Sequence, residues 1–161
     1  MAGPIFLSAV VAIQRNVEEH GPAAVTVTLG DYVDCGPQSR GVLDRLIENL
    51  FPTPYVALKG NHETVFEAFR ADPATGPYRR QQGGLETLRS YGIHVDGLMG
   101  VSFATSRDQL RAALPATHVQ FVSSLKTSFT RHRYFFCHAG AQPGVPPERQ
   151  SDKDLIWLRN D

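Results

Sequence analysis

LGDYVDCGPQSRG, residues 29–41, is the stretch that decides the fold of this chain. It continues the β-branched run AAVTVTL at 23–29, which predicts a short buried strand ending at Gly30. Glycine permits a sharp turn after a strand, and this turn carries Asp31 and Asp34. The pattern therefore predicts a strand that presents two carboxylates at its carboxyl end.

Two later segments repeat this arrangement of strand, glycine and polar residue. LKGNHE at 58–63 places Asn61 and His62 side by side ahead of a predicted helix. RYFFCHAG at 133–140 predicts a third strand, with His138 close to its end. We expect the three strands to be parallel, so that their polar residues meet on one rim, where open α/β sheets place their sites.

Most of the remaining sequence has helical periodicity, with a second strand predicted at 55–58. Ser39 is expected to cap the first helix after the 29–41 motif, residues 71–84 are expected to form a loop, and residues 93–105 have no clear pattern. The predicted helices are 5–19, 39–50, 62–70, 85–92, 106–114 and 117–125. This order predicts a layered α/β fold in a single domain over residues 1–161.

Composition excludes several functional classes. The formal net charge is zero, so no basic surface indicates nucleic acid or an anionic membrane as a partner. No apolar run approaches the roughly 18 residues of a membrane span, and the first residues do not resemble a signal peptide. Cys35 and Cys137 lie far apart and lack a metal-type spacing, which predicts free thiols and a cytoplasmic location.

The polar residues at the strand ends have the chemistry of a metal site. Asp31, Asn61 and His138 offer oxygen and imidazole donors, which suit Mn, Fe or Zn better than Ca or Mg alone. Each residue alone also has an ordinary structural interpretation, as a turn residue or a satisfied histidine. We keep that structural interpretation for the other histidines, His20, His94, His118 and His132. Three junctions of a strand, a glycine and a polar residue, one after another along the chain, favour the interpretation as a metal site.

GDYVD, GNHE and HAG, in this order and spacing, resemble the motifs of calcineurin-like metallophosphoesterases. Within that family the chain resembles the bacterial serine/threonine protein phosphatases. The resemblance extends to GPQSRGVLDRLI, QQGGLETLRSYG and PGVPPERQSDKDLIWLR, and it covers the chain from about Ser8 to Arg159. It implies a layered αββα sandwich.

The resemblance also implies a set of roles. Two divalent metal ions, with Mn expected and Fe or Zn as alternatives, would hold the attacking hydroxide between them. Asp31 would bind both ions, and Asn61 and His138 would bind the second. His62 would protonate the leaving alkoxide, and Asp34 would form a hydrogen bond with His62 that fixes its orientation and favours its imidazolium form.

The chain departs from the family pattern in three places. The early GDxHG motif and the late GH motif have no counterpart in these residues, so we expect a domain that is incomplete at both termini. Cys35 stands where the family has an arginine that grips phosphate. Lys59 occupies a position that is basic in relatives, and both phosphate support and a surface role are considered for it.

The expected function is metal-dependent hydrolysis of phosphomonoesters, most specifically by a serine/threonine protein phosphatase. The expected partner is a phosphorylated protein or a small phosphoester, with no nucleic acid and no membrane. Two alternatives stay open: a dinucleoside polyphosphate hydrolase, which shares the three motifs, and a truncated, non-catalytic remnant of the family.

Overall fold

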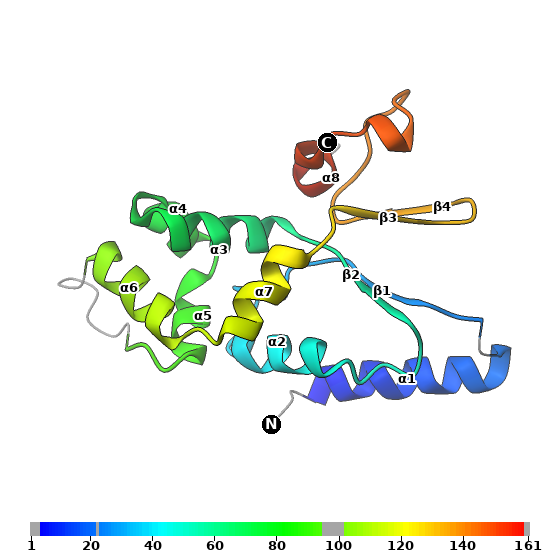
Figure 1. The fold of residues 1–161 in the computed structure, drawn as a ribbon, viewed down its shortest axis with the longest axis horizontal. Helices are drawn as coiled ribbons and strands as arrows, with labels where there is room; N and C mark the ends of the chain where they lie inside the picture. The colour runs from blue at the N-terminus through cyan, green and yellow to red at the C-terminus, as the bar shows by residue number, and fades with distance from the viewer. Residues whose placement is uncertain (1–3, 22, 95–101, 160–161) are drawn as a thin grey trace.

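The first strands and helices alternate along the chain, and a run of helices separates them from the last two strands, in the computed structural model, which describes residues 4–21, 23–94 and 102–159 (Figure 1). The strands are β1 Thr26–Thr28, β2 Tyr55–Ala57, β3 Ser128–Arg131 and β4 Tyr134–Cys137. The helices are α1 Pro4–His20, α2 Ser39–Glu48, α3 Asn61–Ala71, α4 Gly76–Gln81, α5 Gly84–Ser90, α6 Phe103–Ala113, α7 Ala116–Ser124 and α8 Asp152–Trp157, with 3-10 turns η1 Pro73–Thr75 and η2 Pro147–Arg149. The predicted α/β class is confirmed.

The first two predicted strands pair as expected. β1 and β2 are parallel, with Thr26 opposite Tyr55 and Thr28 opposite Ala57. Each spans three residues, fewer than the sequence pattern suggested. Because parallel strands end at the same edge of a sheet, the loops that follow β1 and β2 lie side by side. This pairing brings the first two motifs together.

The third strand does not join β1 and β2 as a parallel neighbour, so that part of the prediction is wrong. β4 instead pairs antiparallel with β3, with Ser128 opposite Cys137 and Arg131 opposite Tyr134. The two-residue turn between them begins at His132, whose φ is 54°. The hairpin extends away from the helices to the right in Figure 1. The carboxyl end of β4 nevertheless returns toward the end of β1, as the site below shows.

The predicted helices are present, with shifts of a few residues at their ends. Residues 71–84, expected to form a loop, contain η1 and α4, and α8 was not predicted. Ser39 is the first residue of α2 rather than its cap, which is Gln38. The helix ends at Glu48, and Asn49 follows in the left-handed conformation, which tolerates asparagine. Residues 95–101, within the stretch that had no clear pattern, lie outside the described residues.

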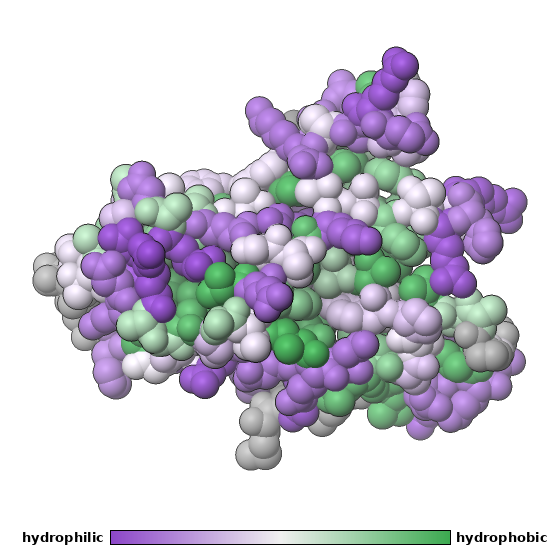
Figure 2. Space-filling model, in the orientation of Figure 1, coloured by the Kyte–Doolittle hydropathy of each residue, from purple (hydrophilic) through white to green (hydrophobic). Residues whose placement is uncertain are grey.

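The buried core lies between α2, α3, α5, α6 and α7, on the left in Figure 1. Val33 from the first motif and Phe66 from α3 are both fully buried in it, so the site loops are anchored directly to the core. Some large apolar side chains are exposed, and green patches reach the surface in Figure 2. Among the described residues, no helix has both the length and the apolar character that crossing a bilayer requires.

Candidate metal centre

Two glycines let the first two motifs come into contact. Gly30 has a φ of 101°, and a β-carbon there would overlap the backbone nitrogen of Gly60. A β-carbon on Gly60 would in turn overlap an oxygen of Asp31. The predicted sharp turn at Gly30 is therefore confirmed. Gly60 is needed because any side chain there would collide with Asp31. In the same turn, Asp31 and Asp34 both have positive φ, at 60° and 66°.

Glu63 ties these two loops together. Its carboxylate is fully buried and accepts hydrogen bonds from the backbone N–H groups of Asp31 at 2.8 Å, Tyr32 at 2.7 Å and Gly60 at 2.9 Å. Burial raises the pKa of Glu63, while these backbone hydrogen bonds lower it. The sequence analysis missed this residue. The signal was its position at the third residue of α3, where a glutamate reaches back to the N–H before the helix.

The three predicted metal ligands come together. The imidazole Nε2 of His138 lies 2.9 Å from Oδ1 of Asn61 and 3.5 Å from Oδ1 of Asp31. Ligands held about 2.1 Å from an ion lie roughly 3–3.5 Å from one another. These spacings therefore suit a shared cation. His138 arrives from the β3–β4 hairpin, whereas Asp31 and Asn61 arrive from the ends of β1 and β2.

The orientation of His138 also favours a cation. Its Nδ1 lies 2.6 Å from the carbonyl oxygen of Leu29, and a carbonyl oxygen only accepts, so Nδ1 carries a proton and donates. In the neutral ring Nε2 then presents a lone pair to the oxygens of Asn61 and Asp31. Acceptors that converge in this way suit the coordination of a cation. A backbone carbonyl that fixes a ligating histidine is a common feature of metal sites.

His62 and Asp34 face each other beside these ligands. Nδ1 of His62 lies 3.7 Å from Oδ2 of Asp34, too far for a hydrogen bond, and neither buried atom has another partner. Asp34 raises the pKa of His62, and this effect outweighs partial burial, with smaller contributions from Asp31 and Glu63. The backbone N–H of His62 also points at Oδ1 of Asp31, at 3.4 Å. The predicted pair is thus adjacent to the candidate metal ligands, although the predicted hydrogen bond is not formed at this distance.

Asp34 is held by residues that the sequence analysis did not single out. Arg79 of α4 donates from its guanidinium to Oδ1 of Asp34 at 2.9 Å, and the Thr87 hydroxyl of α5 donates to the same oxygen at 2.6 Å. Arg79 is 2% exposed and stacks over Phe66 and Phe69, with 5.2 and 5.0 Å between its guanidinium carbon and the ring centroids. Burial lowers the pKa of Arg79, and Asp34 opposes this.

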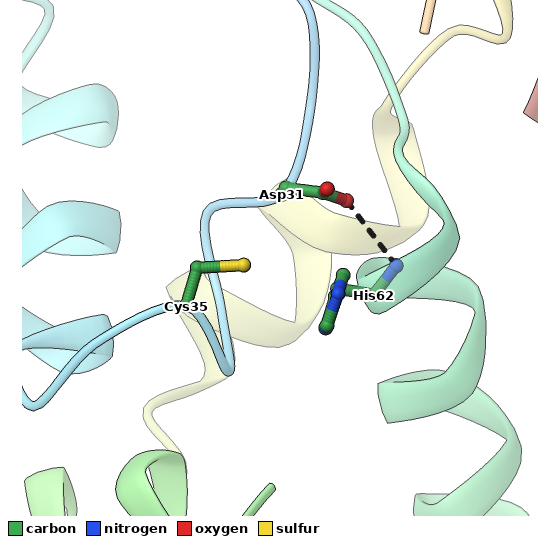
Figure 3. Close-up of side chains that lie close together, drawn as sticks. All are labelled: Asp31, Cys35 and His62. Carbon is green, nitrogen blue, oxygen red and sulfur yellow. Dashed lines mark hydrogen bonds between the residues drawn. The ribbon is translucent and has the colours of Figure 1, made fainter. Parts of the chain in front are cut away.

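The sequence left the roles of Cys35 and Lys59 open. Ligand atoms of Cys35, Asp31 and His62 all lie within 4.8 Å of one another, and the Cys35 side chain is directed at the other two in Figure 3. Partial burial and the nearby carboxylates raise the pKa of Cys35 to about 11. Lys59 instead pairs with Glu67 at 2.6 Å, which supports its structural interpretation.

Histidines away from the centre fit their structural interpretation. His118 is buried, with Nδ1 2.7 Å from the Tyr91 hydroxyl and Nε2 2.8 Å from an oxygen of Asp44. His94 and His132 are exposed, and the side chain of His20 lies outside the described residues. None of the three histidines His94, His118 and His132 belongs to the cluster of Asp31, Cys35 and His62, the cluster of possible metal ligands among the described residues.

An open cavity of about 450 Å³ adjoins the metal ligands. Asn61 and His138 form one side of it, and Gly140, Trp157 and Arg159 contribute to the rest. The cavity therefore offers an aromatic surface and a guanidinium next to the candidate metal ligands.

Comparison with known proteins agrees with this geometry. The family model described as calcineurin-like phosphoesterase matches residues 6–160. A comparison with curated proteins finds no match.

Proposed function

The chain belongs to the calcineurin-like phosphoesterase family, and on that premise we propose that it hydrolyses phosphomonoesters, most specifically phosphoserine and phosphothreonine in proteins. Membership of the family supports a metal-dependent phosphoesterase. The observation that carries the finer proposal is the contact between His62 and the buried Asp34, directly beside the metal ligand Asp31. A proton donor in that position suits a substrate whose leaving group is a poor one.

Divalent ions, of which this family generally uses two, supply phosphoryl polarisation and an activated nucleophile when bound. Asp31, Asn61 and His138 would hold such an ion, because their donor atoms converge at suitable spacings. We propose manganese as the native metal, since oxygen and imidazole donors suit it. The chain also contributes positioning, because Glu63 fixes the loop that carries Asp31.

His62 would act as the general acid. Its Nδ1 is buried and faces Asp34, so Nε2 is the nitrogen that is available to donate a proton to a substrate oxygen. Asp34 favours the imidazolium form and orients the ring, while Arg79 and Thr87 hold Asp34 in place. An alkoxide such as that of serine needs this proton as the bond to phosphorus breaks, because it is a strong base.

The adjoining cavity gives the substrate a place beside the metal ligands. Arg159 lines it and offers the bidentate donors that bind a phosphoryl group, and Trp157 offers a flat surface for the group attached to it. We also propose a cytoplasmic location, with which the free thiols of Cys35 and Cys137 agree.

The test compares two substrates in the presence of Mn²⁺. His62→Asn should lower turnover of a phosphoserine peptide by about 10²–10⁴, the usual range for general acid catalysis. Turnover of an aryl phosphate with a good leaving group should fall much less. His132→Asn is the matched control, because His132 is exposed in a hairpin turn whose positive φ asparagine tolerates. Equal losses on both substrates would remove His62 from the acid role.

The same assay separates the competing interpretations. A dinucleoside polyphosphate would be hydrolysed in preference to the phosphopeptide if the chain were a dinucleoside polyphosphate hydrolase. A folded chain that hydrolyses none of the three substrates at saturating Mn²⁺ would be a non-catalytic member of the family.

A further inference from the structure

We propose that Cys35, Asp31 and His62 form a second kind of metal site, selective for a thiophilic divalent ion such as Zn²⁺. This site shares Asp31 with the site of Asn61 and His138, and it also uses Cys35 and His62, the latter being the proposed proton donor. It goes beyond the proposed phosphoesterase activity because occupancy by zinc would block that activity.

The geometry requires only a small adjustment. One donor atom from each of the three side chains lies within 4.8 Å of the other two. Bonds of about 2.3 Å to sulfur and about 2.0–2.2 Å to nitrogen and oxygen would draw these atoms somewhat closer together. Cys35 is exposed, so its thiol can rotate without displacing core atoms. Figure 3 shows the thiol, the carboxylate and the imidazole arranged around a common space.

Asp34 provides an orienting partner for the imidazole ligand. Its side chain is fully buried, and its Oδ2 has no hydrogen-bond partner while it faces Nδ1 of His62. A carboxylate behind a histidine fixes the ring and leaves the other nitrogen for the metal. Nε2 of His62 is therefore the nitrogen that is free to bind the metal.

The donor set determines the class of metal. A thiolate, an imidazole and a carboxylate select Zn²⁺ or a similar ion over Mn²⁺ and Mg²⁺, which prefer oxygen. Binding converts the Cys35 thiol to a thiolate and releases its proton to solvent. His62 cannot donate a proton from Nε2 while that nitrogen coordinates zinc. The site would thus make the enzyme sensitive to inhibition by zinc.

Cobalt titration of the whole metal-free chain tests the site directly, because Co²⁺ resembles Zn²⁺ and a bound thiolate gives a charge-transfer band in the near ultraviolet. The wild-type chain should show this band, and Zn²⁺ should remove it by displacing Co²⁺. Cys35→Ser should abolish the band, whereas Cys137→Ser, the matched control at the other free cysteine, should keep it. His62→Asn should weaken Co²⁺ binding at least about tenfold, since even outer residues of metal sites contribute 10–100-fold.

A further arm separates this site from the one in the proposed function. His138→Ala should keep the thiolate band, because His138 is not part of this cluster, while it weakens Mn²⁺ binding. The two readouts therefore test the two sites separately, so one site can be refuted while the other is supported.

A second measurement needs no variant. Zn²⁺ should slow alkylation of Cys35 in the wild-type chain at least about tenfold and leave alkylation of Cys137 unchanged, measured by mass spectrometry of the modified peptides. Any one of three results would overturn the proposal: no charge-transfer band in the wild type, a band still present in Cys35→Ser, or an alkylation rate of Cys35 that Zn²⁺ leaves unchanged.

Discussion

Arg79→Met tests whether the buried ion pair with Asp34 organises the centre. The two side chains are 2% and 0% exposed, and their nearest atoms are 2.9 Å apart. The substitution leaves a buried carboxylate without its cation, which typically costs 3–5 kcal/mol in proteins. Thr87 still donates to the same carboxylate oxygen, so we expect the lower end, about 3 kcal/mol. For a chain of this size that loss corresponds to a melting temperature lower by roughly 6–12 °C.

Urea unfolding of the metal-free protein is the assay, with Arg80→Met as the control. Arg80 follows Arg79 on α4 but is exposed, so its substitution should change stability by no more than about 0.5 kcal/mol. The double variant Arg79→Met with Asp34→Asn should cost less than the sum of the single variants by at least about 1 kcal/mol, because each single variant leaves one buried charge unpaired and the double variant leaves none. Similar stability of the two arginine variants, or strict additivity in the cycle, would refute the reasoning.

Three further predictions address individual positions. Cys35→Arg should tighten inhibition by free phosphate roughly ten- to a hundredfold, since each charge-assisted hydrogen bond contributes about 1.5–3 kcal/mol, and an unchanged inhibition constant would show that this loop does not face the substrate. Gly60→Ala should weaken Mn²⁺ binding at least about tenfold by calorimetry, because the new methyl group overlaps the neighbouring loop, whereas Gly36→Ala has open space and should bind normally. Asp34→Asn should lower the pKa of His62 in the metal-free protein toward the ordinary value of about 6.5, so that less of it is protonated at neutral pH. Nuclear magnetic resonance titration measures this shift, and an unchanged titration curve would contradict the assigned cause.

Short-range spacing explains why part of the fold was predictable. A β-branched run, a glycine and a carboxylate follow one another within a few residues, so β1 and its turn are encoded locally. Strand pairing is not local. The sequence of β3 lacks a clear alternation of apolar and polar residues. The turn between β3 and β4 begins at His132 and lacks the glycine or asparagine that marks most two-residue hairpins. The antiparallel partner of β4 was therefore missed, although His138 was correctly predicted to lie near the other ligands.

The candidate site likewise contains residues that could be predicted from the sequence and residues that could not. Asp31, Asn61 and His62 could be placed because each directly follows a predicted strand. Arg79 could not, because it follows Asp34 by 45 residues and belongs to a segment that resembled a loop. An arginine in such a segment usually indicates a solvated surface. Its burial depends on the packing of α4 against α3, which no local pattern reveals.

The balance of charge gives a physical reason for a cation at this centre. Carboxylates of Asp31, Asp34 and Glu63 all act on Cys35 and His62 in the direction that raises a pKa. Arg79 is already paired with one of them. A divalent ion beside Asp31 would oppose this negative field and so lower the pKa of both titrating groups. We therefore expect metal binding to be coupled to the protonation of His62, with the charge of Asp34 helping His62 to keep the proton that a leaving group would need.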